Sequence, residues 1–250
     1  PVQQAMVNYH GSQCGFCTPG FVMSLFSMFK NYSRFKDNVI KDSIAGNLCR
    51  CTGYQPIIKA AKSLNNKNKT DHFTKNKQNV IILLKKIKNE TLVIYKKDKK
   101  YFAPRYVQEL KKILKKNINS HLLSGGTDLS LIVTKERKDI NSIIYMNSID
   151  ELNYIKDNSK YIEVGATTPL IKFENYIQKY YSDFATILKR YGSVQIRNVA
   201  TIAGNIATAS PIGDTLPLLL SLDAKIVLRS IKKTKIISLD NFFVDYRKTK

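Results

Sequence analysis

The chain has 250 residues, 43% of them hydrophobic, and its 41 basic and 19 acidic residues give a formal net charge of +22. This apolar fraction is ordinary for a globular protein. No apolar run approaches the roughly 18–20 residues of a membrane span, and nothing at the start resembles a secretory signal, so we expect a soluble, cytoplasmic protein. The charge raises nucleic-acid binding as a competing function, but the lysines are dispersed and no reader motif accompanies them, so we expect no nucleic-acid partner.

All four cysteines fall in two tight pairs, Cys14 with Cys17 and Cys49 with Cys51. Four thiols in two such pairs suit tetrahedral binding of zinc or of an iron–sulfur cluster. A disulfide is less favoured, because a one-residue spacer makes a bridge within the second pair awkward. Structural zinc sites usually combine two C-x(2–4)-C motifs, whereas two irons need two ligands each, so the C-x-C half favours a 2Fe–2S cluster. A zinc-stabilised basic binding protein remains the alternative from a different class.

Three helices are expected around these cysteines. Thr18-Pro19 reads as an N-cap followed by proline at the first helical position, and an apolar stripe follows it. Asp37 can cap a second helix that Gly46 ends, and Gln55-Pro56 opens a third. The first helix begins directly behind Cys17, so its N-terminus would favour thiolate charge. The pattern predicts a compact all-α module.

The residues around the cysteines resemble the second 2Fe–2S domain of the xanthine dehydrogenase family of molybdenum hydroxylases. The resemblance rests on Gln13 to Gly20 and on Ala45 to Tyr54, in this order and at this spacing, and it covers about residues 1–62. It implies that the cluster ligands are Cys14, Cys17, Cys49 and Cys51. It also implies that Gln13 lies near a molybdenum cofactor carried by another subunit or domain.

The chain changes character after the third helix. Residues 63–100 are rich in Lys and Asn without a sustained apolar face, which is typical of a basic linker, with one strand expected at 92–95. From residue 101 to 250 the pattern is α/β. Strands are expected at 121–124, 142–146, 161–165 and 224–229, and helices at 106–116, 174–181 and 184–191.

Two glycine-bearing segments carry the candidate chemistry of this second domain. In the first, a strand runs into Gly125-Gly126 and then a helix, where backbone N–H groups can approach a phosphate. Taken alone, such a turn more often merely connects a strand to a helix. The second segment, residues 201–214, reads as an irregular polar loop between apolar stretches, and its simpler interpretation is two ordinary turns.

Together, the two segments resemble the flavin domain of the same family, of the vanillyl-alcohol-oxidase or PCMH-like type. The first segment inherits the role of holding the FAD pyrophosphate and comprises Leu122, Leu123, Ser124, Gly125, Gly126, Thr127, Asp128 and Leu129. The dinucleotide contacts carried over to the second are Thr201, Ile202, Ala203, Gly204 and Asn205, with Asp214 at its polar edge. Tyr191 aligns with an aromatic that stacks on the isoalloxazine in animal relatives. Ala203 departs from the usual Gly-Gly-Asn and adds a methyl group there.

The resemblance implies an α+β multidomain protein that relays electrons. A 2Fe–2S helical-bundle domain followed by an FAD-binding domain resembles the small subunit of bacterial members of the family. A molybdopterin-binding large subunit would oxidise hypoxanthine or xanthine, and electrons would pass through 2Fe–2S clusters to FAD and on to NAD. We assign no catalytic residue, and a related enzyme acting on an aldehyde or another N-heterocycle is the alternative. The match begins and ends partway through the family's domains, so we expect a fragment that is inactive alone.

Overall fold

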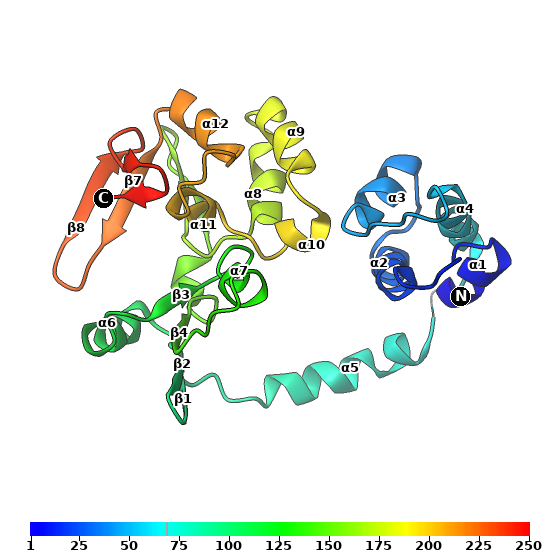
Figure 1. The fold of residues 1–250 in the computed structure, drawn as a ribbon, viewed down its shortest axis with the longest axis horizontal. Coiled ribbons are helices and arrows are strands. Elements are labelled where there is room, and N and C mark those ends of the chain that lie inside the picture. Colours follow the sequence, from blue (N-terminus) through cyan, green and yellow to red (C-terminus); the bar gives the residue numbers. More distant parts are fainter. Residues whose placement is uncertain (69) are drawn as a thin grey trace. The chain divides into compact units, whose positions relative to one another are not determined.

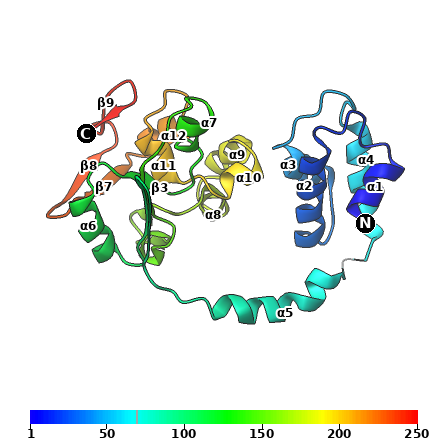
Figure 2. The ribbon, with the colours of Figure 1, turned by 60° about the horizontal axis from the view of Figure 1, so that its bottom comes forward.

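A computed structural model describes residues 1–68 and 70–250 of the chain. The chain divides into two compact units. The first comprises Pro1–Lys88 together with Gly192–Gln195, and the second comprises Asn89–Tyr191 together with Ile196–Lys250. Figures 1 and 2 show the elements of both units in two views.

The first unit is entirely helical in its described residues. Its core helices are α1 (Val2–Asn8), α2 (Thr18–Asn31), α3 (Asp37–Ile44) and α4 (Gln55–Ser63), and a 3₁₀ turn, Leu64–Asn66, follows. All four helices contribute to one hydrophobic core, in which Phe21, Leu25 and Ile57 are fully buried. The three predicted helices are confirmed, but Cys17 and Lys36, rather than Thr18 and Asp37, are the N-caps of α2 and α3. The sequence pattern missed α1, a short helix whose Val2, Ala5 and Met6 are buried in the same core.

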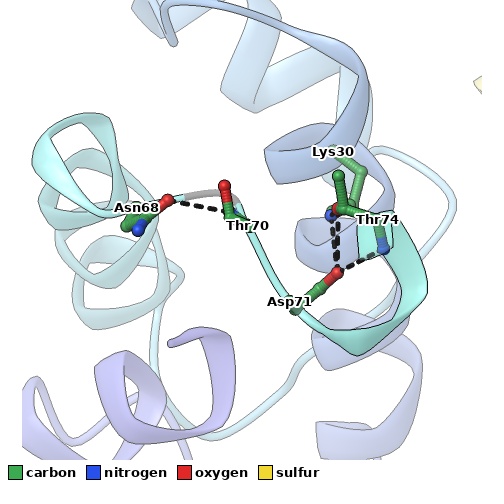
Figure 3. A network of polar contacts seen from close by, with 5 residues as sticks. All are labelled: Lys30, Asn68, Thr70, Asp71 and Thr74. Carbon is green, nitrogen blue, oxygen red and sulfur yellow. Dashed lines mark hydrogen bonds and ion pairs between the residues drawn. The ribbon is translucent and has the colours of Figure 1, made fainter. Parts of the chain in front are cut away.

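A fifth helix, α5 (His72–Lys85), lies inside the segment that we predicted to be a linker. Asp71 is its N-cap and accepts a 2.9 Å hydrogen bond from the backbone N–H of Thr74. Lys30 of α2 donates to the same carboxylate at 3.0 Å and to the Thr74 hydroxyl at 2.6 Å, as Figure 3 shows. Just before the helix, the N–H of Thr70 donates to the Asn68 side chain. A side chain distant in sequence therefore fixes the start of this helix.

A four-stranded sheet opens the second unit. Its strands are β1 (Leu92–Lys96), β2 (Lys99–Ala103), β3 (His121–Leu123) and β4 (Ser142–Tyr145), in the order β1-β2-β4-β3. The β1–β2 pair is antiparallel, and β4 runs parallel to both of its neighbours. Helix α6 (Val107–Lys116) packs its Leu110 against Phe102 and Ile144 of the sheet. The parallel strands β3 and β4 therefore end at the same edge, where the first glycine segment begins.

Helices α8 (Leu170–Ile177) and α9 (Ser182–Arg190) form most of the second core of this unit, with residues of α11 (Ile202–Ala207) and α12 (Thr215–Ser221) packed against them. Two further short helices are α7 (Ser130–Thr134), after β3, and α10 (Val194–Arg197), whose first two residues belong to the first unit. Phe173 of α8 and Phe184 of α9 meet edge to face with ring centroids 5.6 Å apart. Helices α8 and α9 lie side by side in Figure 1. Ala200 and Ile202 extend this core to the second glycine segment.

Three antiparallel hairpins complete the unit. They pair β5 (Ile155–Asp157) with β6 (Ile162–Val164), β7 (Lys225–Arg229) with β8 (Thr234–Ser238), and β9 (Phe243–Asp245) with β10 (Lys248–Thr249). A 3₁₀ turn, Asp150–Leu152, precedes the first. All the strands and helices predicted after residue 101 appear at or within a few residues of the expected positions.

The structure corrects two sequence-based expectations. Residues 63–100 are not a plain linker, because α5 and most of the β1–β2 hairpin lie there, and β2 is hydrogen-bonded into the sheet. Residues 202–207 are not an irregular loop. They form α11, because the Thr201 hydroxyl caps it by accepting from the Gly204 N–H at 3.0 Å.

Candidate cofactor sites

The four cysteines lie on two loops of the first unit and approach one another in pairs. The Cys14 and Cys51 sulfurs are 3.4 Å apart, and the Cys17 and Cys49 thiols are close enough for a hydrogen bond. Gly15 takes φ +83° between the first two cysteines, a backbone conformation that favours glycine and lets the C-x-x-C loop turn back. None of the four is in a disulfide.

The Cys49 thiol has the environment of a metal ligand. Thr52 hydrogen-bonds to its sulfur through both the hydroxyl, at 3.1 Å, and the backbone N–H, at 3.5 Å, and these contacts lower the pKa of Cys49 to about 7. The Tyr54 hydroxyl accepts from the Cys49 N–H at 3.1 Å. A thiol of this pKa is substantially deprotonated near neutral pH, which is the ligating form.

The other three thiols are shifted by one another and by burial. A hydrogen bond from the Phe16 backbone lowers the pKa of Cys14, and Cys51 adds to this effect. The pKa of Cys51 is raised mainly by its hydrogen bond to Cys14. Burial raises the pKa of Cys17, although it is the N-cap of α2, so the helix N-terminus does not dominate at that position. Within each pair, therefore, one thiol has a lowered pKa and the other a raised pKa.

The donor set fits a two-iron cluster. Two thiolates on one tetrahedral metal at about 2.3 Å lie about 3.8 Å apart, close to the Cys14–Cys51 sulfur distance. Across the described residues, no three His, Cys, Asp or Glu side chains converge on one point suited to a single metal ion. The sulfurs gather as two pairs, and each pair can supply the two protein ligands that one iron of a 2Fe–2S cluster takes.

The two glycine segments of the second unit lie against each other. Gly125 lies two residues after β3 and so close to the residues leading into the second segment that a Cβ there would lie 2.8 Å from the Ala200 Cα. It would lie closer still to the Val199 carbonyl. Only glycine permits this approach, and the predicted pairing of the two segments in one site is therefore sterically specific.

Tyr191 joins the second segment through a polar network. Its hydroxyl accepts a 2.8 Å hydrogen bond from the Asn205 amide, and the amide oxygen of Asn205 accepts from the Thr215 hydroxyl. Burial raises the pKa of Tyr191, and the negative charges of Asp214 and Asp128 raise it further. Three of the residues inherited from the family resemblance, Asn205, Asp214 and Asp128, therefore act on one half-buried tyrosine.

Three residues of this region were not predicted from the sequence. The Ser124 hydroxyl donates to Asn147 at 2.6 Å, and Arg247 forms a 3.1 Å ion pair with Asp128. Thr215 is the third. Asn147 follows β4, the parallel neighbour of β3, so the shared strand edge was a signal that could have revealed it. Arg247 lies 119 residues from Asp128, and no local pattern links the two.

A cleft of about 280 Å³ borders the second segment. Ser210, Pro211 and Gly213 form one side, and Phe243 and Tyr246 of the last hairpin form another. The hairpin that carries Arg247 therefore lies beside both segments.

The predicted site residues differ in how far their side chains are exposed to a ligand. Ile202 is buried in the core, so its backbone alone is available to a ligand. Leu122, Thr127 and Asp214 are exposed, while Ala203 and Leu129 are half-buried at the starts of α11 and α7. The methyl group of Ala203 is accommodated within the helix.

The fold and both sites place the chain in a known family. Residues 95–250 match the FAD binding domain in molybdopterin dehydrogenase, and residues 1–62 match a [2Fe-2S] binding domain. The chain belongs to the molybdopterin dehydrogenase family, with a 2Fe–2S-binding domain followed by an FAD-binding domain. The predicted family, fold class and two cofactors are confirmed.

The similar proteins are oxidoreductases of the molybdenum hydroxylase type. The chain is 30% identical to xanthine dehydrogenase of Emericella nidulans over 99% of its own length and 22% of the relative's. It is 27% identical to xanthine dehydrogenase/oxidase of Gallus gallus, covering 24% of that protein. The chain thus spans about a quarter of the length of these relatives. Among solved structures, a carbon monoxide dehydrogenase chain from Hydrogenophaga pseudoflava matches with a TM-score of 0.57 and 26% identity, over 62% of this chain and 55% of that one.

Within the described residues, no helix is both long and apolar enough to cross a membrane.

Proposed function

We propose that this chain is the electron-transfer portion of a xanthine dehydrogenase, carrying electrons from a molybdenum centre on a partner through 2Fe–2S clusters to FAD and on to NAD. The observation that carries the proposal is the presence on one chain of two cysteine pairs and a site formed by two glycine segments. When bound, the cluster supplies one-electron transfer and FAD supplies the exchange between single electrons and hydride.

The residues of this chain would hold and orient the two groups. Cys14, Cys17, Cys49 and Cys51 would ligate the irons. Residues 122–129 would hold the pyrophosphate. The glycines in the turn after β3 have no side chain, so a phosphate can approach the backbone N–H groups there. Residues 201–205 and Asp214 would contact the rest of the dinucleotide. Tyr191, fixed by Asn205, would pack against the flavin ring.

A surface beside the cysteines suits a partner that carries the molybdenum cofactor. Phe16 is 96% exposed and Leu48 is 84% exposed, and each lies next to a cysteine. Phe16 and Leu48 thus present two large apolar side chains on the two loops that carry the cysteines. Gln13, also exposed, lies on the same loop as Phe16. A molybdopterin-binding subunit docking here would approach the cluster closely.

The substrate would be selected outside this chain, and the relatives' names bear on it. Relatives named xanthine dehydrogenase support xanthine as the substrate. Hypoxanthine as a second substrate, NAD as the acceptor and a place in the cytoplasm are further parts of the proposal. The reaction at the purine would occur on the partner. A partner selecting an aldehyde or another N-heterocycle would leave the roles of this chain unchanged.

Reconstitution tests the proposal directly. After anaerobic addition of iron, sulfide and FAD, the chain should hold about two irons, about two labile sulfides and about one flavin. Stoichiometric zinc without sulfide would overturn the cluster assignment. NADH should reduce the bound flavin, and xanthine should do so only after a molybdopterin-binding partner is added. Oxidation of an aldehyde but not of xanthine by that complex would overturn the purine assignment alone.

A matched pair of variants tests the pyrophosphate role of the first segment. Thr127 is exposed in the turn, so Thr127→Glu adds a negative charge without a clash, and Thr127→Gln is the neutral control. We expect the Glu variant to bind FAD more weakly than the Gln variant, with the difference shrinking as salt is added. Equal affinities would contradict an anion site at this turn.

A further inference from the structure

Arg197 is a charged residue with no exposure to solvent. It ends α10, and 0% of its surface is accessible. A guanidinium is rarely buried unless charged and carbonyl groups surround it, so its position indicates a specific arrangement of partners.

Those partners come from separate helices. The Nε of Arg197 lies 3.1 Å from Oε2 of Glu174 on α8, itself nearly fully buried. One terminal nitrogen, Nη1, donates at 2.9 Å to the carbonyl oxygen of Lys189, in the last turn of α9. Carbonyls in a last helical turn have no partner within their helix and carry partial negative charge, so a cation fits there. One side chain therefore ties α8, α9 and α10 together.

The segments leaving these helices carry the candidate flavin residues. Tyr191 follows α9, two residues after Lys189. Four residues after Arg197, Thr201 begins the second segment and pairs with Pro169 at the start of α8, and the Leu170 N–H donates to the Ala200 carbonyl at 2.8 Å. The spacing of Tyr191 from the two glycine segments thus depends on how these helices are held.

We propose that Arg197, through its ion pair with Glu174, is a positioning residue that sets the distance between Tyr191 and the two glycine segments and so preorganises the flavin site. The inference rests on the proposed flavin function. Replacing a buried ion pair by apolar residues of similar volume is often neutral for stability. The stability of the fold therefore does not require the ion pair. A fixed spacing between Tyr191 and the glycine segments does require it.

The test compares flavin binding with stability in the full chain. In the double variant Glu174→Leu/Arg197→Met, we expect a melting temperature within about 4 °C of the parent and unchanged iron content. We expect FAD to bind roughly tenfold more weakly, because the site is no longer preorganised. The fluorescence of bound flavin should also rise, since a displaced Tyr191 quenches it less. Arg197→Lys keeps the charge and should restore part of both properties.

Arg190→Met is the matched control. Arg190 is exposed at the end of α9, next to Tyr191, and its loss should change neither affinity nor fluorescence. If the double variant keeps the FAD affinity and flavin fluorescence of the parent, the inference is overturned. It is also overturned if FAD affinity falls only in proportion to stability across all variants and Arg197→Lys restores neither. A parent chain that binds iron but no flavin would overturn the proposed flavin function and this inference together.

Discussion

The two cofactor sites are built in opposite ways. The proposed cluster site takes its four cysteines from two short loops within residues 14–51, and the helices around them share one core. The proposed flavin site draws on segments near residues 125, 147, 191, 201–205, 215 and 247, which only tertiary packing brings together. A site of the first kind depends on the identity of a few atoms. A site of the second kind depends on spacing, so residues that never touch the ligand can control it.

The largest effect is expected from losing a cysteine ligand. Cys49→Ser should abolish or badly perturb cluster assembly, and the first unit should unfold more readily, because ligation and folding are coupled in small metal domains. Flavin content should stay near that of the parent. Iron, labile sulfide, flavin and helical circular dichroism measure these outcomes. Arg50→Ala is the matched control, since Arg50 is exposed between two cysteines.

An intact cluster in Cys49→Ser would show that ligand identity does not govern this site. Loss of flavin together with iron would show that the two sites are not independent, and the comparison between them would fail.

A methyl group at Gly125 should have the next largest effect. In Gly125→Ala the added Cβ meets the backbone at Val199 and Ala200, which cannot yield as a flexible side chain would. The two glycine segments should move apart, and FAD affinity should fall by about tenfold or more. Titration with FAD measures this, and iron content is the internal control. An affinity within twofold of the parent would mean that close contact of the segments is not needed.

A smaller effect is expected from the bond between Asn205 and Tyr191. Asn205→Ala removes the donor that holds the Tyr191 hydroxyl, and Tyr191→Phe removes the hydroxyl but keeps the ring. Each should weaken FAD binding by a few fold. The double variant should bind no more weakly than Asn205→Ala, because that variant already lacks the bond to Tyr191 as well as the one to Thr215. Additive losses would show that the two side chains act separately.

These sites also mark how far the sequence predicts the structure. The cysteine pairs, the helix that begins at Thr18-Pro19 and the strand leading to Gly125 follow from local patterns, and all were expected. The ion pair between Arg247 and Asp128 could not be expected, because it depends on the last hairpin folding back onto a distant turn. Burial of Arg197 is equally unreadable from sequence, where a basic residue ordinarily indicates a surface position.

Helix α5 was missed for a related reason. It buries no residue, and apart from Phe73 its apolar residues run consecutively from Val80 to Leu84, after a stretch of lysines and asparagines, so no helical stripe is visible. Its first turn is held by Asp71 and by Lys30, a residue of another helix. A tertiary contact supplies the start signal that the local composition lacks.

The smallest effect is expected from the contacts of Asp71 at the start of α5, and it depends on pH. The Thr74 N–H and Lys30 lower the pKa of Asp71 from its usual 3.8 to about 2, so the carboxylate stabilises the folded first turn of α5 above pH 4. This contribution is lost as pH falls from about 4 through about 2, because the unfolded chain takes up the proton first. Asp71→Asn keeps a capping side chain without the charge. Hydrogen exchange at the Thr74 amide should therefore be faster in the variant than in the parent at pH 6, and the difference should shrink at pH 3 in cluster-free protein. A difference equally large at both pH values would show that the contact with Lys30 does not fix α5, and that the helix owes its start to residues of its own.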